Sequence, residues 1–120
     1  MSAANKAKGS KFEIANETYG MDSGLRAKRL PRAGANDIGD MSIDLKSGKV
    51  LVAEIKDWAK PAWPEFLRQA EIEATNYANK YRCETYGFVI QKRRMKGVAQ
   101  SYVMFELEEF YALLKGEGIA

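Results

Sequence analysis

The stretch that decides the fold reads GDMSIDLKSGKVLVAEIK and covers residues 39–56. It holds two runs in which apolar and polar residues alternate. They are joined by Lys46-Ser47-Gly48, a pattern that predicts a β-hairpin with Gly in the left-handed position of the turn. The second run places Glu54 and Lys56 in an otherwise apolar strand. Because side chains alternate between the two faces of a strand, both charges project to the same side.

The register of this hairpin follows from packing. The apolar side chains of both runs must face one core, and a slip of one residue would turn a whole set outward. The pairing that meets this requirement sets Asp44 opposite Val50 and Asp40 opposite Glu54. Two carboxylates and the ammonium group of Lys56 then meet on one face. Oxygen ligands of this kind are preferred by Mg²⁺, so the hairpin predicts a metal site.

The composition narrows the possible classes of protein. A chain of 120 residues with 46% hydrophobic and 29% charged residues suits a single globular domain. The absence of histidine excludes Ser-His and Cys-His catalysis, and the single Cys83 cannot form an internal disulfide. The net charge of +3 permits a nucleic-acid partner. The single cysteine predicts a reducing, cytoplasmic location, and we expect no membrane partner because no apolar run approaches the ~18 residues of a membrane span.

The N-terminal third predicts an arm and a helix. Residues 1–8 are small, polar and basic, and we expect a flexible arm before one domain over residues 9–120. A helix should follow over about residues 11–19, with Ser10 as its N-cap and Gly20 at its end. Glu13 is then either a capping-box carboxylate or a group that points at the metal. The buried stripe of this helix should hold Phe12, Ala15 and Tyr19.

The rest of the chain predicts a helix over residues 63–82, strands over 85–92 and 101–106, and a helix over 107–115. Together with the hairpin this order indicates an α/β domain with a small mixed sheet flanked by helices. The apolar faces are expected to be buried. They comprise Trp63, Phe66, Leu67, Ala70, Ala74, Tyr77, Ala78 and Tyr81 in the first helix, and Leu107, Phe110, Tyr111 and Leu114 in the second.

Two basic segments accompany the acidic residues. One precedes Asp40 and the other forms the turn between the last two strands. Each is either a phosphate-binding surface or a solvated charged surface. We favour phosphate contact, because basic residues immediately precede the acidic cluster in sequence, where they could hold a nucleic-acid backbone beside the carboxylates. The candidate DNA-binding residues are Lys8, Lys11, Arg26, Lys28, Arg29, Arg32, Lys92, Arg93, Arg94 and Lys96.

Several motifs resemble known nucleases. Asp40, a spacer of about a dozen residues and then Glu54-x-Lys56 resemble the PD-(D/E)XK nuclease superfamily. Residues 8–13, KGSKFE, are similar to the Lys-Gly-x-x-x-Glu opening of archaeal and bacteriophage Holliday junction resolvases. Residues 32–40 and 66–71 are similar to segments of small phage resolvases, and the resemblance covers roughly residues 8–114.

The resemblance implies a restriction-endonuclease-like core and a Mg²⁺-dependent (or Mn²⁺-dependent) endonuclease that makes paired symmetric nicks in four-way DNA junctions as a homodimer. It implies that Glu13, Asp40 and Glu54 bind the metal, with the Ile55 carbonyl as a further ligand, and that Lys56 orients the attacking water. The compartment would be the cytoplasm of the bacterial host if the gene is phage-borne. Further candidates are Gln69 and Asp37 as accessory residues, and Tyr81, Tyr86, Tyr102 and Tyr111 at the dimer surface.

Several alternatives stay open from the sequence. A flap, fork or single-strand nuclease would use the same residues. A non-catalytic DNA-binding module could keep the fold, and in a plain structural protein Glu54 and Lys56 would form a buried salt bridge, which adds little net stability. Gln69 could be a surface side chain, Asp37 rivals Asp40 for the metal, and Trp58 could cover either a base or the core.

Overall fold

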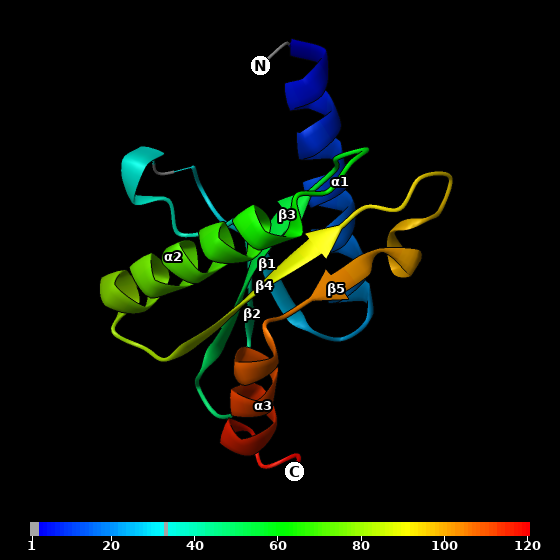
Figure 1. The fold of residues 1–120 in the computed structure, drawn as a ribbon. Helices are drawn as coiled ribbons and strands as arrows, with labels where there is room; N and C mark the ends of the chain where they lie inside the picture. Colours follow the sequence, from blue (N-terminus) through cyan, green and yellow to red (C-terminus); the bar gives the residue numbers. More distant parts are fainter. Residues whose placement is uncertain (1–2, 33) are drawn as a thin grey trace.

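The computed structural model describes residues 3–32 and 34–120, which form a five-stranded mixed sheet flanked by three helices (Figure 1). The helices are α1 (Ala3–Asp22), α2 (Trp63–Tyr81) and α3 (Leu107–Gly116). The strands are β1 (Arg26–Arg29), β2 (Met41–Asp44), β3 (Val50–Lys56), β4 (Thr85–Gln91) and β5 (Tyr102–Met104). Short 3-10 helices cover Gly34–Asn36 and Val98–Gln100. The α/β class with a small mixed sheet is therefore confirmed.

The strands lie in the order β1-β2-β3-β4-β5. Only β3 and β4 run parallel among the strands described, because α2 carries the chain back between them, and the other three pairs are antiparallel. The predicted hairpin register is confirmed, with Asp44 opposite Val50 and Met41 opposite Ala53. Gly48 closes the turn with a φ of 93°, the left-handed conformation that the turn requires.

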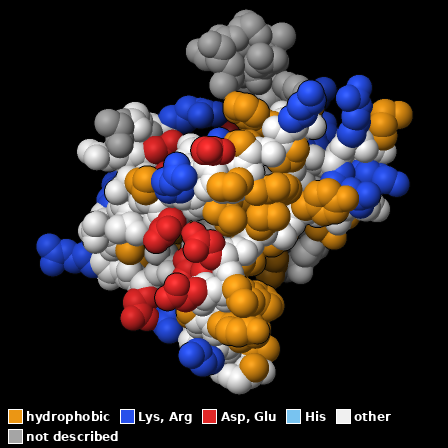
Figure 2. All heavy atoms as spheres, in the orientation of Figure 1, with side chains coloured by type: hydrophobic (Ala, Val, Ile, Leu, Met, Phe, Trp, Pro, Cys, Tyr) orange, Lys and Arg blue, Asp and Glu red, His pale blue; other side chains and the backbone are white. Residues whose placement is uncertain are grey.

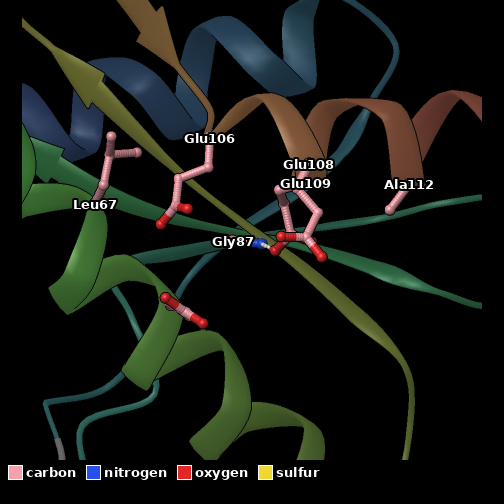
Figure 3. Close-up of a pocket in the computed structure, with 7 residues that line it drawn as sticks. Leu67, Gly87, Glu106, Glu108, Glu109 and Ala112 are labelled. Atoms are coloured by element: carbon pink, nitrogen blue, oxygen red, sulfur yellow. Dashed lines mark hydrogen bonds between the residues drawn. The ribbon is translucent and has the colours of Figure 1, made fainter.

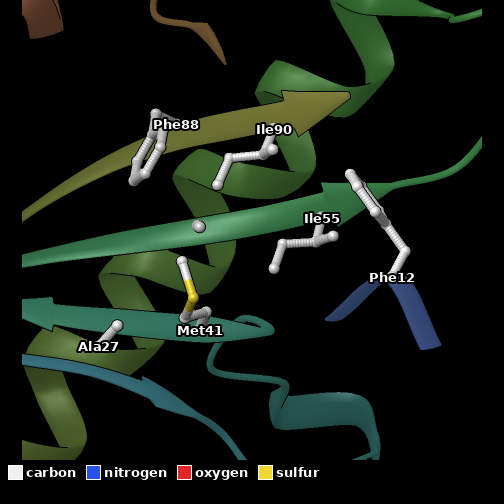
Figure 4. Packing of buried hydrophobic residues seen from close by; sticks show 7 residues of the cluster. Phe12, Ala27, Met41, Ile55, Phe88 and Ile90 are labelled. Atoms are coloured by element: carbon white, nitrogen blue, oxygen red, sulfur yellow. The ribbon is translucent and has the colours of Figure 1, made fainter. Parts of the chain in front are cut away.

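The sheet is apolar on both faces because helices cover both. The α1 side holds the larger cluster, made of Phe12, Ala27, Met41, Ala53, Ile55, Phe88 and Ile90 (Figure 4). The α2 side holds Val50, Val52, Phe66, Ala70, Ala74 and Val89. Strand alternation therefore sends Ile55 toward α1, and sends Glu54 and Lys56 toward α2. The two charges lie under a helix and not on an open face.

The helix α2 packs closely on β4 at Gly87. A Cβ atom at Gly87 would lie 2.9 Å from the carbonyl oxygen of Ala70 and 3.0 Å from Cβ of Ala74. Real Cβ atoms rarely approach other atoms so closely, so only glycine fits here without moving the helix. This contact fixes the height of α2 above the sheet.

The first helix is longer than predicted. It begins at Ala3, so residues 3–8, which the sequence predicts to be part of an arm, are helical, while residues 1–2 lie outside the described part of the chain. Alanine and lysine favour a helix strongly enough to extend it through Gly9 and Ser10. Gly20 does not end the helix, which continues to Asp22, and Gly20 instead packs against Ala27, where an added Cβ would lie only 2.7 Å away.

Other predicted burials are also wrong. Tyr19 and Tyr81 are each 49% exposed, and in α1 the side chain of Asn16 is buried instead. The predicted strand over residues 101–106 shortens to β5 because the preceding residues form a 3-10 helix. In α3, Leu107 is 65% exposed and Tyr111 is 54% exposed. Among the described residues, no helix combines the length and hydropathy needed to cross a bilayer.

Candidate functional site

Asp40 is fixed by the backbone of two neighbouring segments. Its N–H donates to the carbonyl of Ala53 and its carbonyl accepts from the N–H of Leu30, each at 2.9 Å. Its Oδ2 atom accepts a hydrogen bond of 2.8 Å from the N–H of Ile55. The preceding Gly39 has a φ of 101°, and an added Cβ there would lie 2.6 Å from Val52. The chain therefore turns into β2 in a way that buries the Asp40 carboxyl beside β3.

Glu54 and Lys56 lie next to this carboxyl, on the α2 side of β3. The Nζ atom of Lys56 is 3.1 Å from Oε1 of Glu54, and their side chains are only 14% and 5% exposed. Nζ also lies 5.0 Å from the ring centroid of Phe66 in α2. The second oxygen of Glu54, Oε2, is buried and has no hydrogen-bond partner. The expected convergence of Asp40, Glu54 and Lys56 is thus present in the fold, while their roles stay a prediction.

Glu13 comes from α1, and its carboxylate is held by two arginines. Its Oε1 atom is 3.5 Å from Nη2 of Arg29, and its Oε2 atom accepts a hydrogen bond of 3.2 Å from Nη2 of Arg32. The capping-box alternative is wrong, because α1 begins at Ala3 and Glu13 lies in its interior. The charge of Glu13 contributes to the raised pKa of Asp40, so Glu13 belongs to the same acidic group.

A residue that sequence reasoning missed completes the group. Glu73 of α2 is 3% exposed, its carboxyl is within hydrogen-bond reach of Glu54, and its buried Oε1 atom has no partner. A sequence signal for it did exist. Glu73 lies three residues after Ala70 and four before Tyr77, both on the expected buried face of the helix. A carboxylate inside an apolar stripe should have been recognised as a candidate.

Burial strongly perturbs these carboxyl groups. Loss of solvent and, next, the neighbouring Glu54 together raise the pKa of Asp40 to about 8, against the lowering effect of the Ile55 N–H. Burial and the Glu73 carboxyl likewise raise the pKa of Glu54 to about 8, although Lys56 opposes them. Burial also raises the pKa of Glu73. The site therefore holds more negative charge than its own cations compensate once it ionises.

The two accessory candidates flank Glu73. Asp37 accepts a hydrogen bond of 3.2 Å from the N–H of Gly39 through Oδ1, which makes it part of the turn before Asp40. The Gln69 side chain is exposed and hydrogen-bonds to Glu73. Both line a surface depression along α2 that reaches Glu73 and Asn76. The structure thus places Asp37 and Gln69 at the mouth of the acidic group.

The basic residues divide into two sets. Arg29 and Arg32 meet Glu13, and the N–H of Lys92 donates to the carbonyl of Lys56, which brings the start of the β4–β5 turn to the site. Figure 2 shows basic side chains around this turn, at the right of the molecule. In the second set Arg93 lies over the Tyr102 ring, 4.6 Å from its centroid, and the other members are exposed, namely Lys11, Arg26, Lys28, Arg94 and Lys96. The side chain of Lys8 lies outside the description.

Two aromatic side chains border the site. Trp58 follows β3, is 55% exposed, and packs edge-on against Phe66 with ring centroids 5.4 Å apart. The carbonyl of Trp58 accepts a hydrogen bond of 2.8 Å from the buried Gln91 side chain. Trp58 therefore covers apolar surface at Phe66, while more than half of the residue stays exposed to solvent.

A second pocket lies elsewhere, between α2, β4 and α3 (Figure 3). It is lined by four glutamates together with apolar side chains and Gly87, and Oε2 of Glu109 accepts a hydrogen bond of 2.9 Å from the Gly87 N–H. The glutamates are Glu71, Glu106, Glu108 and Glu109. Their negative charge disfavours a phosphate here, which separates this pocket from the basic side of the molecule.

Among the described residues, no three acidic or sulfur-bearing side chains already surround a point that could hold a metal ion. The reason is visible in the contacts, since Glu13 faces its arginines and Glu54 faces Lys56. Comparison with models of protein families and with curated proteins found no match to this chain. Inference about its function therefore depends on the geometry of its own residues.

Proposed function

We propose that the protein is a metal-dependent DNA endonuclease that resolves four-way junctions. The observation that carries the proposal is the burial of Asp40 and Glu54 against each other, on adjacent segments, with Lys56 3.1 Å from Glu54. Burying two carboxyl groups together opposes stability unless a cation or a proton compensates them. A protein that only had to fold would gain from apolar residues at these positions.

The residues fit a divalent cation by their chemistry. The side-chain atoms that could coordinate a cation are carboxylate oxygens, and the buried Oε2 atom of Glu54 receives no hydrogen bond. Asp40 and Glu54 would hold Mg²⁺ or Mn²⁺, and the resemblance adds Glu13 and the carbonyl of Ile55. The ion, when bound, supplies positive charge that offsets the charge of the scissile phosphate.

The protein's own cations have separate tasks in this proposal. Lys56, held in place by Glu54, orients the attacking water. Arg29 and Arg32 exchange Glu13 for phosphate oxygens, which the 73% exposure of the Arg32 side chain allows. The basic β4–β5 turn extends the phosphate-binding surface away from the site.

Junction resolution also requires a second active site, and hence a second copy of the chain. The surface for it is proposed at β5 and α3. There, β5 is an edge strand and several apolar side chains are exposed, among them Leu107, Phe110 and Tyr111, which the sequence predicts to be buried. These side chains are Tyr102, Val103, Leu107, Phe110 and Tyr111. Of the four tyrosines considered for this surface, Tyr86 is excluded because it is only 6% exposed.

The test is cleavage of a mobile four-way junction, compared with linear duplex, flap and single-stranded DNA, each with Mg²⁺ or EDTA. We expect paired nicks on the junction with Mg²⁺ and none with EDTA. Lys56→Ala should abolish cleavage and leave DNA binding almost unchanged, whereas Lys46→Ala, at the exposed hairpin tip, should cleave normally.

Other results would change the proposal in defined ways. Cutting of flaps as well as junctions would indicate a broader branched-DNA nuclease. Binding without any cleavage would indicate a non-catalytic module. Normal cleavage by Lys56→Ala would contradict the role given to the lysine.

A further inference from the structure

We infer that Glu73 of α2 is a ligand of the divalent cation together with Glu54, and that it contributes more to cation affinity than Glu13 does. This inference rests on the proposed function, because it assigns a further residue to the same cation. It also moves one ligand from α1, where the resemblance places it, to the helix between β3 and β4.

The first observation is a pair of buried oxygens without partners. Oε2 of Glu54 and Oε1 of Glu73 receive no hydrogen bond from a donor, although their residues are 4% and 3% exposed, and the two carboxyl groups lie within reach of each other. Lys56 does not satisfy this pair, because its Nζ lies on the other oxygen of Glu54. Buried carboxylate oxygens are rarely left unpaired. A cation between them would satisfy both.

The second observation is the contrast with Glu13. Both of its oxygens face arginine, at 3.5 Å from Arg29 and 3.2 Å from Arg32. A metal would have to displace at least one of these ion pairs before Glu13 could bind it. Glu73 has no such competitor at Oε1. The free protein therefore has a cation-binding oxygen ready at Glu73, whereas both oxygens of Glu13 are engaged by arginines.

The third observation is a route to the pair. The surface depression along α2 is lined by Glu73, Asp37, Gln69 and Asn76, and also by Glu65, Arg68 and the exposed Ile72. A hydrated ion can reach Glu73 from solvent through this depression. Two carboxylates are enough for Mg²⁺, which usually keeps several waters and takes further ligands from substrate phosphate. The pair thus needs no third protein ligand in the free protein.

The test measures binding of Mn²⁺ alone, without DNA, by the loss of the free Mn²⁺ electron paramagnetic resonance signal. Glu73→Gln should weaken Mn²⁺ binding at least tenfold, and Glu13→Gln should weaken it less than threefold. Glu71→Gln is the matched control, because Glu71 lies on the same helix but is exposed. Urea unfolding verifies that each variant is folded. If Glu73→Gln does not fold, Glu73→Asp replaces it. Because the aspartate side chain is shorter, we expect its Mn²⁺ affinity to lie between that of the wild type and the tenfold weaker value.

The outcomes separate the inference from the proposed function. Wild-type protein that binds no Mn²⁺ at millimolar concentration would overturn both. Wild-type binding with equal binding by Glu73→Gln would overturn the inference alone, and would mean that Glu54 and Glu73 only share a proton. A larger loss of Mn²⁺ affinity for Glu13→Gln than for Glu73→Gln would mean that Glu13 of α1, and not Glu73, is the ligand.

Discussion

Replacing Asp40 by Asn should make the protein less sensitive to high pH. The pKa of Asp40 is raised from 3.8 to about 8 by burial and by Glu54, so the folded state holds a proton that the unfolded state releases. This contribution to the free energy of unfolding is complete below pH 3.8 and is lost as the pH rises through about 8. Asparagine cannot ionise, and its amide oxygen can still accept the hydrogen bond from Ile55.

The magnitude follows from the pKa values. Between pH 5 and pH 8, each pH unit removes at most about 1.4 kcal/mol, which gives an upper limit of roughly 4 kcal/mol. Asp40 titrates together with Glu54, so part of this loss is shared between them. We expect the free energy of unfolding to fall between pH 5 and pH 9 by roughly 2 to 4 kcal/mol less in Asp40→Asn than in the wild type.

The assay is urea unfolding followed by tryptophan fluorescence at pH 5 and pH 9 in EDTA. Asp44→Asn is the control, because Asp44 lies in the adjoining β2 strand with an exposed side chain. The free energy of unfolding of Asp44→Asn should change with pH as that of the wild type does. If Asp40→Asn loses as much stability as the wild type, or if the wild type is equally stable at both pH values, the Asp40 carboxyl is not buried as described.

Three further substitutions test other parts of the structure. Gly39→Ala should lower the free energy of unfolding by roughly 2 kcal/mol or more, because φ is 101° and the new Cβ would clash with Val52. A urea midpoint within error of the wild-type value would refute this. Arg93→Gln with Arg94→Gln should reduce the slope of log affinity against log salt by roughly 2 in DNA-binding titrations, whereas an unchanged slope would remove this turn from the phosphate-binding surface. Phe110→Glu should convert the proposed dimer to monomer in light scattering, and an unchanged mass would place the interface elsewhere or show that no dimer forms.

Local rules were enough for the hairpin. Its register depends on a period of two and on a glycine turn, both of which are visible in residues 39–56. Asp40 could therefore be preferred over Asp37 as the neighbour of Glu54 before any coordinates were known. The preference agrees with the turn hydrogen bond that occupies Asp37.

The remaining errors come from tertiary context. Gly9 and Ser10 predicted a helix start, but neighbouring alanines and lysines favour helix strongly enough that α1 continues through both residues. Glu73 was missed as a site residue because charge usually indicates exposure, whereas α2 places its carboxyl against that of Glu54. The apolar face of α3 was expected to be buried, and no described element of this chain covers Leu107 or Tyr111.

The close packing at Gly87 has a consequence for ion selectivity. The height of α2 above the sheet is set where the backbone of Ala70 meets this glycine, and Glu73 is carried on the next turn of the same helix. A methyl group at Gly87 would lift the helix and widen the gap between Glu73 and Glu54. Because discrimination between Mg²⁺ and the larger Ca²⁺ depends on the size of the cavity, a core substitution that touches no carboxylate could shift the preferred ion. Gly87 would then influence which ion binds, because it sets the width of the gap between Glu54 and Glu73.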